Sequence, residues 1–294
     1  MAAMSDAVRL FVFGLGYSAT ALARRLKGRA AIAGTTRDPE KVIALSAEGL
    51  DALLFDGRSP GTDVAESVGD ATHVLVSIAP GDTDPVLTHH AHVIRASRNL
   101  RWIGYLSTVG VYGNYGGAWV TERNTPHPKS ERAVRRLAAE RAWAKLAAEK
   151  GVPLAIFRLA GIYGPGRNAF VNLAEGRAHR IVKPGQVFNR IHVDDIAATM
   201  VAALDRNAEG IFNVTDDEPA PPQDVVACAA GLMGVEPPPE VLFASADLSP
   251  MARSFYADNK RVANRRIKQK LGLALRYPTY REGLAALWRD GNWR

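Results

Sequence analysis

Residues 8–26 read VRLFVFGLGYSATALARRL, and this stretch decides the fold. Val8–Phe13 is an apolar run typical of a buried strand, and Thr20–Leu26 has the apolar spacing of a helix. Between them, Gly14–Ala19 forms a G-x-G-x-x-A turn. A turn of this kind between a strand and a helix is typical of dinucleotide binding, with the pyrophosphate at the positive end of the helix.

The small residues of this turn have separate physical roles. Gly14 permits the tight turn, Gly16 lets a pyrophosphate approach the backbone, and Ala19 is small enough for the helix to pack on the strand. A glycine turn without a ligand is the alternative, but the strand and helix around it favour a cofactor site. We expect cofactor contacts from Gly14, Gly16, Tyr17, Ser18 and Ala19.

The end of the second expected strand, Ala30–Thr35, discriminates between cofactors. NAD enzymes usually carry an acidic residue there, whereas this chain continues Thr35-Thr36-Arg37. Two hydroxyls followed by an arginine suit a 2′-phosphate, so we expect NADP(H) ahead of NAD(H), with Thr36 and Arg37 as ligands. An arginine that caps a loop is the alternative.

Two further segments follow strands that should end beside the cofactor. Asp56 is placed to meet the adenine amino group, or to serve as a turn residue before Gly57. Ile78, Ala79 and Pro80 end the fourth strand and should border the cofactor.

Strand and helix patterns alternate as far as residue 157. The expected strands after the first two are Leu53–Phe55, Val74–Ile78, Trp102–Leu106 and Leu154–Phe157, and the helices are Pro39–Leu45, Val64–Val68, one opened by Asp84-Pro85, and Ser130–Lys150. The alternation predicts an α/β fold, a Rossmann-type doubly wound parallel sheet. From Gly164 onward the pattern is irregular, which predicts a smaller, mainly C-terminal substrate lobe. We expect a dinucleotide-binding domain at 1–163, with segments from about 191–220, and the lobe at 164–190 and 221–294.

Composition limits the remaining classes of protein. The 294 residues are 47% hydrophobic and 23% charged, as in soluble globular proteins. The single cysteine, Cys228, excludes a disulfide framework and suits a cytoplasmic location, and we expect it to be a buried apolar residue. We expect no signal peptide in Met1–Asp6 and no membrane span.

Charged and metal-ligating residues offer weaker signals. The net charge of +7 is concentrated in Asn259–Lys270, where near-helical spacing of apolar residues predicts the solvated face of a helix and no nucleic-acid partner. His89, His90 and His92 would spread around a helix, so we expect surface residues and no metal site. Asp194-Asp195 should cap a helix.

Four later segments carry a family resemblance: WIGYLSTVGVYG (102–113), RLAGIYGPGR (158–167), RIHVDDIA (190–197) and FNVTDDEP (212–219). With the Gly14–Ala19 turn, they resemble the extended short-chain dehydrogenase/reductase superfamily, in particular NAD(P)-dependent epimerase/dehydratase-like proteins. The resemblance implies Thr108 and Tyr112 as candidate catalytic residues, and Tyr163 at the nicotinamide end. Arg167 and Arg190 could face an anionic small-molecule substrate. A homodimer is a candidate assembly by analogy alone.

The family's proton donor is the tyrosine of a Y-x-x-x-K motif, and that motif is missing here. Within Thr125–Glu140, Arg132 stands at the tyrosine position and Arg136 at the lysine position. Arg136 could still hold a ribose or phosphate, but an arginine is a poor proton shuttle. The departure resembles the atypical branch of the superfamily.

Two functions stay open from the sequence. One is an NADP(H)-dependent reductase- or epimerase-like enzyme acting on a small hydroxyl- or carbonyl-bearing substrate, with a nucleotide sugar as one candidate. The other is a non-catalytic NADP(H)-binding redox sensor, because the catalytic tyrosine and lysine are replaced.

Overall fold

The computed structural model describes residues 8–294, which divide into two compact units. The first comprises the chain up to Ser107, with Val134–Arg158 and Ala197–Phe212. The second comprises Thr108–Ala133, Leu159–Ile196 and Asn213–Arg294. The expected assignment of a cofactor domain and a substrate lobe stays a prediction. Met1–Asp6, where we expect no signal peptide, lies outside the described residues.

A seven-stranded sheet organises the first unit, in the order β11-β7-β5-β4-β1-β2-β3. The ladders of β1 with β2 and β4, of β2 with β3, and of β4 with β5 are parallel, so the expected doubly wound sheet is confirmed. The strands are β1 (Arg9–Phe13), β2 (Ala31–Thr36), β3 (Asp51–Leu54), β4 (His73–Val76), β5 (Trp102–Thr108), β7 (Leu154–Leu159) and β11 (Gly210–Val214). The last residues of β5, β7 and β11 belong to the second unit.

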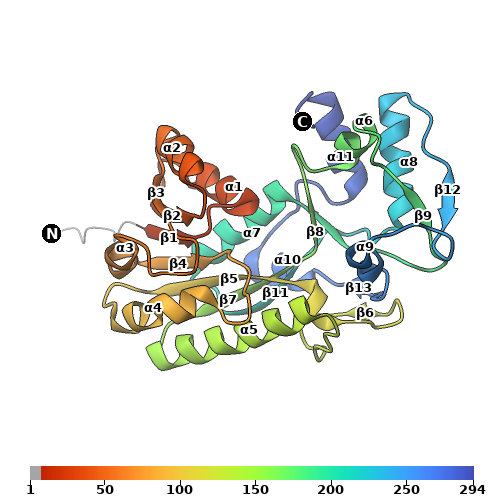
Figure 1. Ribbon diagram of the computed structural model, residues 1–294. Helices are drawn as coiled ribbons and strands as arrows, with labels where there is room; N and C mark the ends of the chain where they lie inside the picture. The colour runs from red at the N-terminus through yellow and green to blue at the C-terminus, as the bar shows by residue number, and fades with distance from the viewer. Residues whose placement is uncertain (1–7) are drawn as a thin grey trace. The chain divides into compact units, whose positions relative to one another are not determined.

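Helices cover both faces of this sheet, which is why most residues of its strands are apolar. Figure 1 shows α1 and α2 on one face and α4 and α5 on the other. The helices are α1 (Tyr17–Leu26), α2 (Pro39–Ala47), α3 (Val64–Asp70), α4 (Pro85–Ala96), α5 (Glu131–Lys150) and α7 (Val193–Leu204). Phe11, Phe13, Tyr105 and Trp143 are among the large side chains buried in this core.

The second unit is built from short elements and long connections. Its paired strands form three two-stranded sheets, β10–β8, β12–β9 and β13–β6. Its elements are a 3-10 turn η1 (Val109–Tyr112), β6 (Trp119–Val120), β8 (Gly161–Tyr163), α6 (Ala169–Ala174), β9 (Arg180–Val182), β10 (Arg190–His192), α8 (Pro222–Met233), β12 (Glu240–Leu242), α9 (Pro250–Phe255), β13 (Arg261–Val262), α10 (Arg265–Leu271) and α11 (Tyr280–Arg289). Phe170, Tyr280 and Leu284 lie in its core, with Cys228 half-buried against them.

The helix expected over residues 259–270 is only partly correct. α10 begins at Arg265, and Arg261–Val262 instead pairs with β6 as strand β13. Lys260, expected on a solvated face, is buried, and its ammonium donates to the Gly113 carbonyl at 2.7 Å. Pairing with a distant segment therefore overrides the local apolar spacing.

One prediction about polar side chains is corrected, and another is extended. His90 is fully buried, with its ring 5.3 Å from that of Phe13 and 5.2 Å from that of Phe55, because α4 turns this position toward the sheet. Burial lowers the pKa of His90 to about 4. Asp195 does more than cap α7, since its buried carboxylate accepts the Arg276 and Tyr277 N–H groups at 2.7 and 3.0 Å.

Among residues 8–294, no helix has the length and apolarity to span a membrane.

Candidate functional site

The turn between β1 and α1 is closed by hydrogen bonds to β2. The Gly14 N–H donates to Thr35 Oγ1 at 3.0 Å, and the Leu15 N–H donates to the Thr35 carbonyl at 2.7 Å. Gly14 has a φ of +92°, and a Cβ built there would lie 2.9 Å from Cγ1 of Ile78. Only glycine therefore fits without backbone strain and displacement of Ile78. The turn brings Gly14 and Ile78 together. Contact of either residue with the cofactor stays a prediction.

The beginning of α1 offers an open, electropositive surface. A Cβ built on Gly16 would meet no atom within 4 Å. Gly16 is also the N-cap of α1, whose first turn has no acidic residue and no side-chain cap. Ser18 and Ala19 are buried, whereas Tyr17 is exposed. Open backbone at the positive end of a helix fits the pyrophosphate of a dinucleotide.

The end of β2 presents two cations near this turn. Arg37 is exposed, and Lys41, from the first turn of α2, donates from Nζ to the Leu15 carbonyl at 2.7 Å. Asp38, the nearest acid, caps α2 by accepting the Glu40 and Lys41 N–H groups. Its Oδ1 is therefore engaged by the helix. Lys41 could not be singled out from the strand-end pattern, although its place in the first turn of the second helix is a local signal.

The hydroxyl that contacts the turn belongs to Thr35. Thr36, the residue expected to bind the cofactor, is buried, and its Oγ1 accepts the Asp38 N–H at 3.3 Å. Asp56 is exposed, and its Oδ1 accepts the Arg58 N–H at 2.9 Å in a turn where Gly57 has a φ of +82°. The structure therefore places Asp56 in the expected turn, while its contact with adenine stays a prediction.

The segment that follows β4, expected to border the cofactor, is partly exposed. Ile78 and Pro80 are half-buried and Ala79 is exposed. Asp84, which follows this segment, is buried and caps α4 by accepting the Val86 and Leu87 N–H groups. Its other oxygen accepts from Trp143 Nε1 at 2.9 Å. Burial raises the pKa of Asp84.

Arg136, at the position of the family's lysine, is half-buried in the first unit. One of its terminal nitrogens, Nη1, donates to the Leu106 carbonyl at 2.6 Å. Its guanidinium carbon lies 5.7 Å from the centre of the Tyr105 ring. These contacts hold the guanidinium over β5 and leave other N–H groups for a ligand.

A buried polar network that the sequence patterns do not predict is centred on Glu140, one helical turn after Arg136. Glu140 Oε1 accepts from Ser107 Oγ at 2.5 Å and from Arg158 Nε at 3.1 Å. Its other oxygen accepts from Arg158 Nη2 at 2.7 Å. The Arg158 and Glu140 side chains are 3% and 4% exposed. Three elements, β5, α5 and β7, are thereby joined inside the first unit.

Thr108 and Tyr112, the two candidate catalytic residues, frame η1 in the second unit. Thr108 Oγ1 accepts the Gly110 N–H at 3.1 Å, which caps this turn. Tyr112 is fully buried, and its hydroxyl donates to Asn213 Oδ1 at 2.7 Å. Thr108 is half-buried. This geometry favours Thr108 over Tyr112 for contact with a substrate.

Tyr163 is buried and Arg190 is half-buried, and both contact backbone carbonyls of the second unit. The Tyr163 hydroxyl is 3.4 Å from the Thr279 carbonyl, and desolvation raises the pKa of this tyrosine. Arg190 Nη1 donates to the Phe188 and Ala220 carbonyls, each at 3.0 Å. Burial lowers the pKa of Arg190. Arg167 is exposed, and its contact with a substrate stays a prediction.

Asp216 was not singled out from the sequence, although it follows β11 in the FNVTDDEP segment. It is 1% exposed; Oδ1 accepts the Glu218 N–H at 3.2 Å, and Oδ2 has no hydrogen-bond partner within residues 8–294. Burial raises its pKa to about 8, against the opposing charge of Arg190. His192, nearby in sequence to Arg190, accepts the Asp194 N–H at Nδ1, and burial lowers its pKa to about 4.

Solved structures of other proteins resemble the chain over nearly its whole length. A solved structure from Silicibacter pomeroyi, described as a functionally unknown conserved protein, is 48% identical, with a TM-score of 0.87 over 97% of this chain and 99% of the other. UDP-glucuronic acid 4-epimerase from Bacillus cereus, solved in complex with NAD, is 18% identical, with a TM-score of 0.77 over 98% of this chain and 100% of that one. This second likeness shows the fold alone.

Two sequence comparisons are more specific. A Streptomyces protein named 3-diazoavenalumate denitrifying reductase is 29% identical over 151 residues, which are 48% of this chain and 49% of the relative. The chain thus spans about half the length of that relative. Residues 71–215 match the family model described as the NAD dependent epimerase/dehydratase family. The glycine turn, the parallel sheet and these matches together establish that the chain belongs to the NAD-dependent epimerase/dehydratase family.

Proposed function

We propose that this protein binds NADP(H) and is a reductase- or epimerase-like enzyme for a small hydroxyl- or carbonyl-bearing substrate. The observation that carries the cofactor choice is the pair of cations at the end of β2. Arg37 is exposed there, and the Lys41 ammonium is held at the Leu15 carbonyl of the turn. Two cations suit the 2′-phosphate that distinguishes NADP from NAD.

The acidic residue near this position supports the same choice. NAD enzymes use a carboxylate after the second strand to accept hydrogen bonds from the ribose hydroxyls. Asp38 uses its Oδ1 to accept the Glu40 and Lys41 N–H groups at 3.0 and 3.4 Å. A carboxylate that serves as an N-cap stabilises α2 and would lose those bonds if it turned toward a ribose.

A binding experiment tests this proposal. NADPH and NADH are titrated into the wild type and into Arg37→Ala, Lys41→Met and Arg25→Met variants, with nicotinamide fluorescence as the readout. Removing either cation should weaken NADPH binding about tenfold or more and change NADH binding less than about threefold, because only NADPH carries the extra phosphate. Arg25, exposed on α1, is the matched control. Equal weakening of both cofactors would refute the NADP(H) assignment.

For the reaction, we propose that Thr108 contacts the substrate oxygen and that Tyr112 positions the turn that carries Thr108. The Thr108 hydroxyl accepts the Gly110 N–H and keeps its own proton for donation. The bound NADPH would supply the hydride. Arg136, braced by the Leu106 carbonyl, would orient the cofactor ribose through its remaining N–H groups. The Streptomyces relative, named as a reductase, supports a reductive reaction.

A turnover experiment follows from these roles. Deuterium-labelled NADPH is incubated with a panel of sugars, nucleotide sugars, aldehydes and ketones, and hydride transfer is detected by mass spectrometry. Thr108→Val should lower the rate on the order of 10²-fold, because it removes one donor to the reacting oxygen. Tyr112→Phe should mainly lower stability. A larger rate loss in Tyr112→Phe than in Thr108→Val would reverse the two roles.

The alternative function is an NADP(H)-binding redox sensor. Arg132 and Arg136 stand at the positions of the family's catalytic tyrosine and lysine, and this replacement favours the sensor. Persistent NADPH binding without hydride transfer to any member of the panel would support it. A cytoplasmic location and a homodimer are also proposed, from the single cysteine and from the superfamily analogy respectively.

A further inference from the structure

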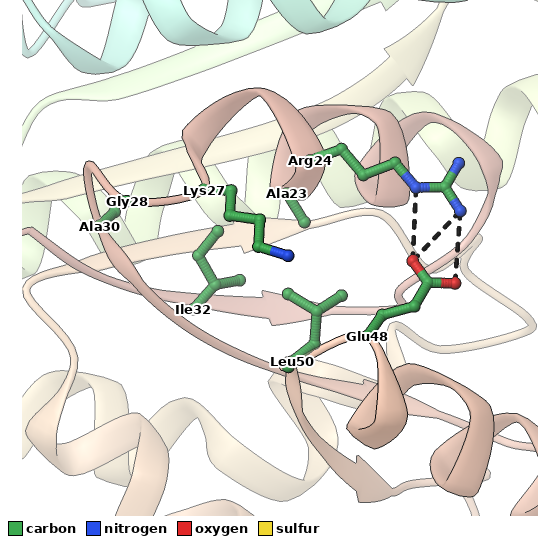
Figure 2. A pocket seen from close by; sticks show the side chains of 9 residues that line it. Ala23, Arg24, Lys27, Gly28, Ala30, Ile32, Glu48 and Leu50 are labelled. Atoms are coloured by element: carbon green, nitrogen blue, oxygen red, sulfur yellow. Dashed lines mark hydrogen bonds and ion pairs between the residues drawn. The ribbon is translucent and has the colours of Figure 1, made fainter.

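A cavity lies in the first unit, at the end of α1 opposite the cofactor turn (Figure 2). It has a volume of about 310 Å³ and lies between the last turn of α1, the beginning of β2 and the segment after α2. The cofactor turn instead contacts Thr35, near the far end of β2. Ligand pockets begin at about 300 Å³, so this cavity is large enough for a small molecule.

The floor of the cavity is apolar. Ala23 of α1 is buried, and Ile32 of β2 and Leu50 are half-buried, so the aliphatic side chains of Ile32 and Leu50 keep exposed surface inside it. A ligand that covers exposed apolar side chains in a cavity removes their surface from water, and this burial favours binding. A cavity of about 150 Å³ that is lined by Leu, Ile and Phe binds benzene, so the volume of this cavity has room for a larger ligand.

The charges around the cavity are arranged so that one cation faces it without a partner. Arg24 and Glu48 pair across one side at 3.2 Å, which neutralises the acid. Figure 2 shows Lys27 pointing into the cavity between Ile32 and Leu50. Lys27 forms no ion pair within residues 8–294. Gly28, with a φ of +77°, turns the chain sharply after Lys27 and leaves that side open.

We propose that this cavity binds a monocarboxylate with an apolar tail of about six to eight carbons. The tail would cover Ile32 and Leu50, and the carboxylate would pair with the Lys27 ammonium. One unneutralised cation favours one negative charge, and the apolar floor disfavours compact anions such as phosphate. This site is independent of the cofactor and extends the proposed function.

Calorimetric titration with octanoate tests the proposal on the full chain without cofactor. Octanoate should bind saturably, with a Kd on the order of 0.1 mM. Octan-1-ol, which lacks the charge, and acetate, which lacks the tail, should each bind at least about tenfold more weakly. NMR spectra of methyl groups should show octanoate shifting the signals of Ile32 and Leu50.

Variants locate the binding. Lys27→Met and Leu50→Gln should each weaken octanoate binding about tenfold, because one removes the charge partner and the other removes apolar floor. Arg25→Met, which changes an exposed cation of the same helix outside the cavity, should bind like the wild type. A thermal melt of each variant checks that it is folded. Absence of saturable octanoate binding, or equal affinity in the wild type and Lys27→Met, would overturn the proposal whether or not NADPH binds.

Discussion

Replacing Arg158 with methionine should destabilise the first unit severely, because it would leave the buried Glu140 carboxylate without its ion-pair partner. Glu140 is 4% exposed and receives its hydrogen bonds from Ser107 and from two nitrogens of Arg158. Removing one partner of a buried ion pair costs about 3–5 kcal/mol, since the remaining charge has neither water nor counter-ion. Urea denaturation followed by circular dichroism would measure the loss in free energy of unfolding.

A double-mutant cycle separates the ion pair from the loss of packing. The Arg158→Met/Glu140→Leu variant buries no charge, so it should recover at least about 2 kcal/mol relative to Arg158→Met alone. The exposed pair Arg95–Glu149, at 3.1 Å and with side chains 50% and 42% exposed, supplies the control. Arg95→Met should cost less than about 1 kcal/mol. If Arg158→Met costs no more than Arg95→Met, or the double variant is no more stable than the single one, the assignment of an energetically coupled network is wrong.

Three further predictions concern single positions. The pKa of Asp216, raised to about 8, means that the folded state binds a proton that the unfolded state loses near pH 4. The free energy of unfolding should therefore fall as pH rises from about 4 to 8, by at most about 1.4 kcal/mol per pH unit from this group, and Asp216→Asn should remove that slope in urea titrations. Gly283→Ala would place a Cβ 2.0 Å from the Tyr163 hydroxyl, so it should cost about 1–3 kcal/mol, and Tyr163→Val should relieve part of that loss in the double variant. Gly14→Ala should lower both the free energy of unfolding and NADPH binding, because Gly14 combines a positive φ with contact to Ile78, whereas Gly16→Ala should weaken NADPH binding in the fluorescence titration without loss of stability, because its Cβ would meet only the pyrophosphate; unchanged binding in Gly16→Ala would contradict this reasoning.

The parts of the candidate cofactor site that depend on residues close together in the chain could be predicted from the sequence. The apolar run before Gly14 and the helical spacing after Ala19 give a strand, a turn and a helix in the predicted order. Asp84-Pro85 opens α4 as expected, because a side-chain cap and a proline at the first helical position are local signals. Element bounds were less accurate: the strand expected at Leu53–Phe55 is Asp51–Leu54. This strand has only four residues, so its alternation of exposed and buried positions is too short to indicate where the strand begins and ends.

Features formed by residues distant in the sequence could not be predicted in the same way. Ser107, Glu140 and Arg158 meet only after β5, α5 and β7 have come together, and each residue alone resembles an ordinary surface or strand residue. Lys41 gave a local signal, but its contact with Leu15 requires α2 to fold back over the turn. The choice between Thr35 and Thr36 depended on strand register, because adjacent residues of a strand face opposite sides of the sheet.

The four arginines expected near ligands show why the reaction is harder to infer than the cofactor. A guanidinium has five N–H donors and binds a backbone carbonyl as readily as a phosphate or carboxylate, so its presence in a motif does not decide its partner. Arg136 and Arg190 use donors on the carbonyls of Leu106, Phe188 and Ala220, which makes part of their function structural. Arg37 and Arg167 are exposed, and their guanidinium groups donate no hydrogen bond within residues 8–294. Their donors are the ones that a ligand can occupy without breaking the fold, so binding losses in Arg37 and Arg167 variants can be interpreted directly, whereas losses in Arg136 and Arg190 variants need a stability measurement beside them.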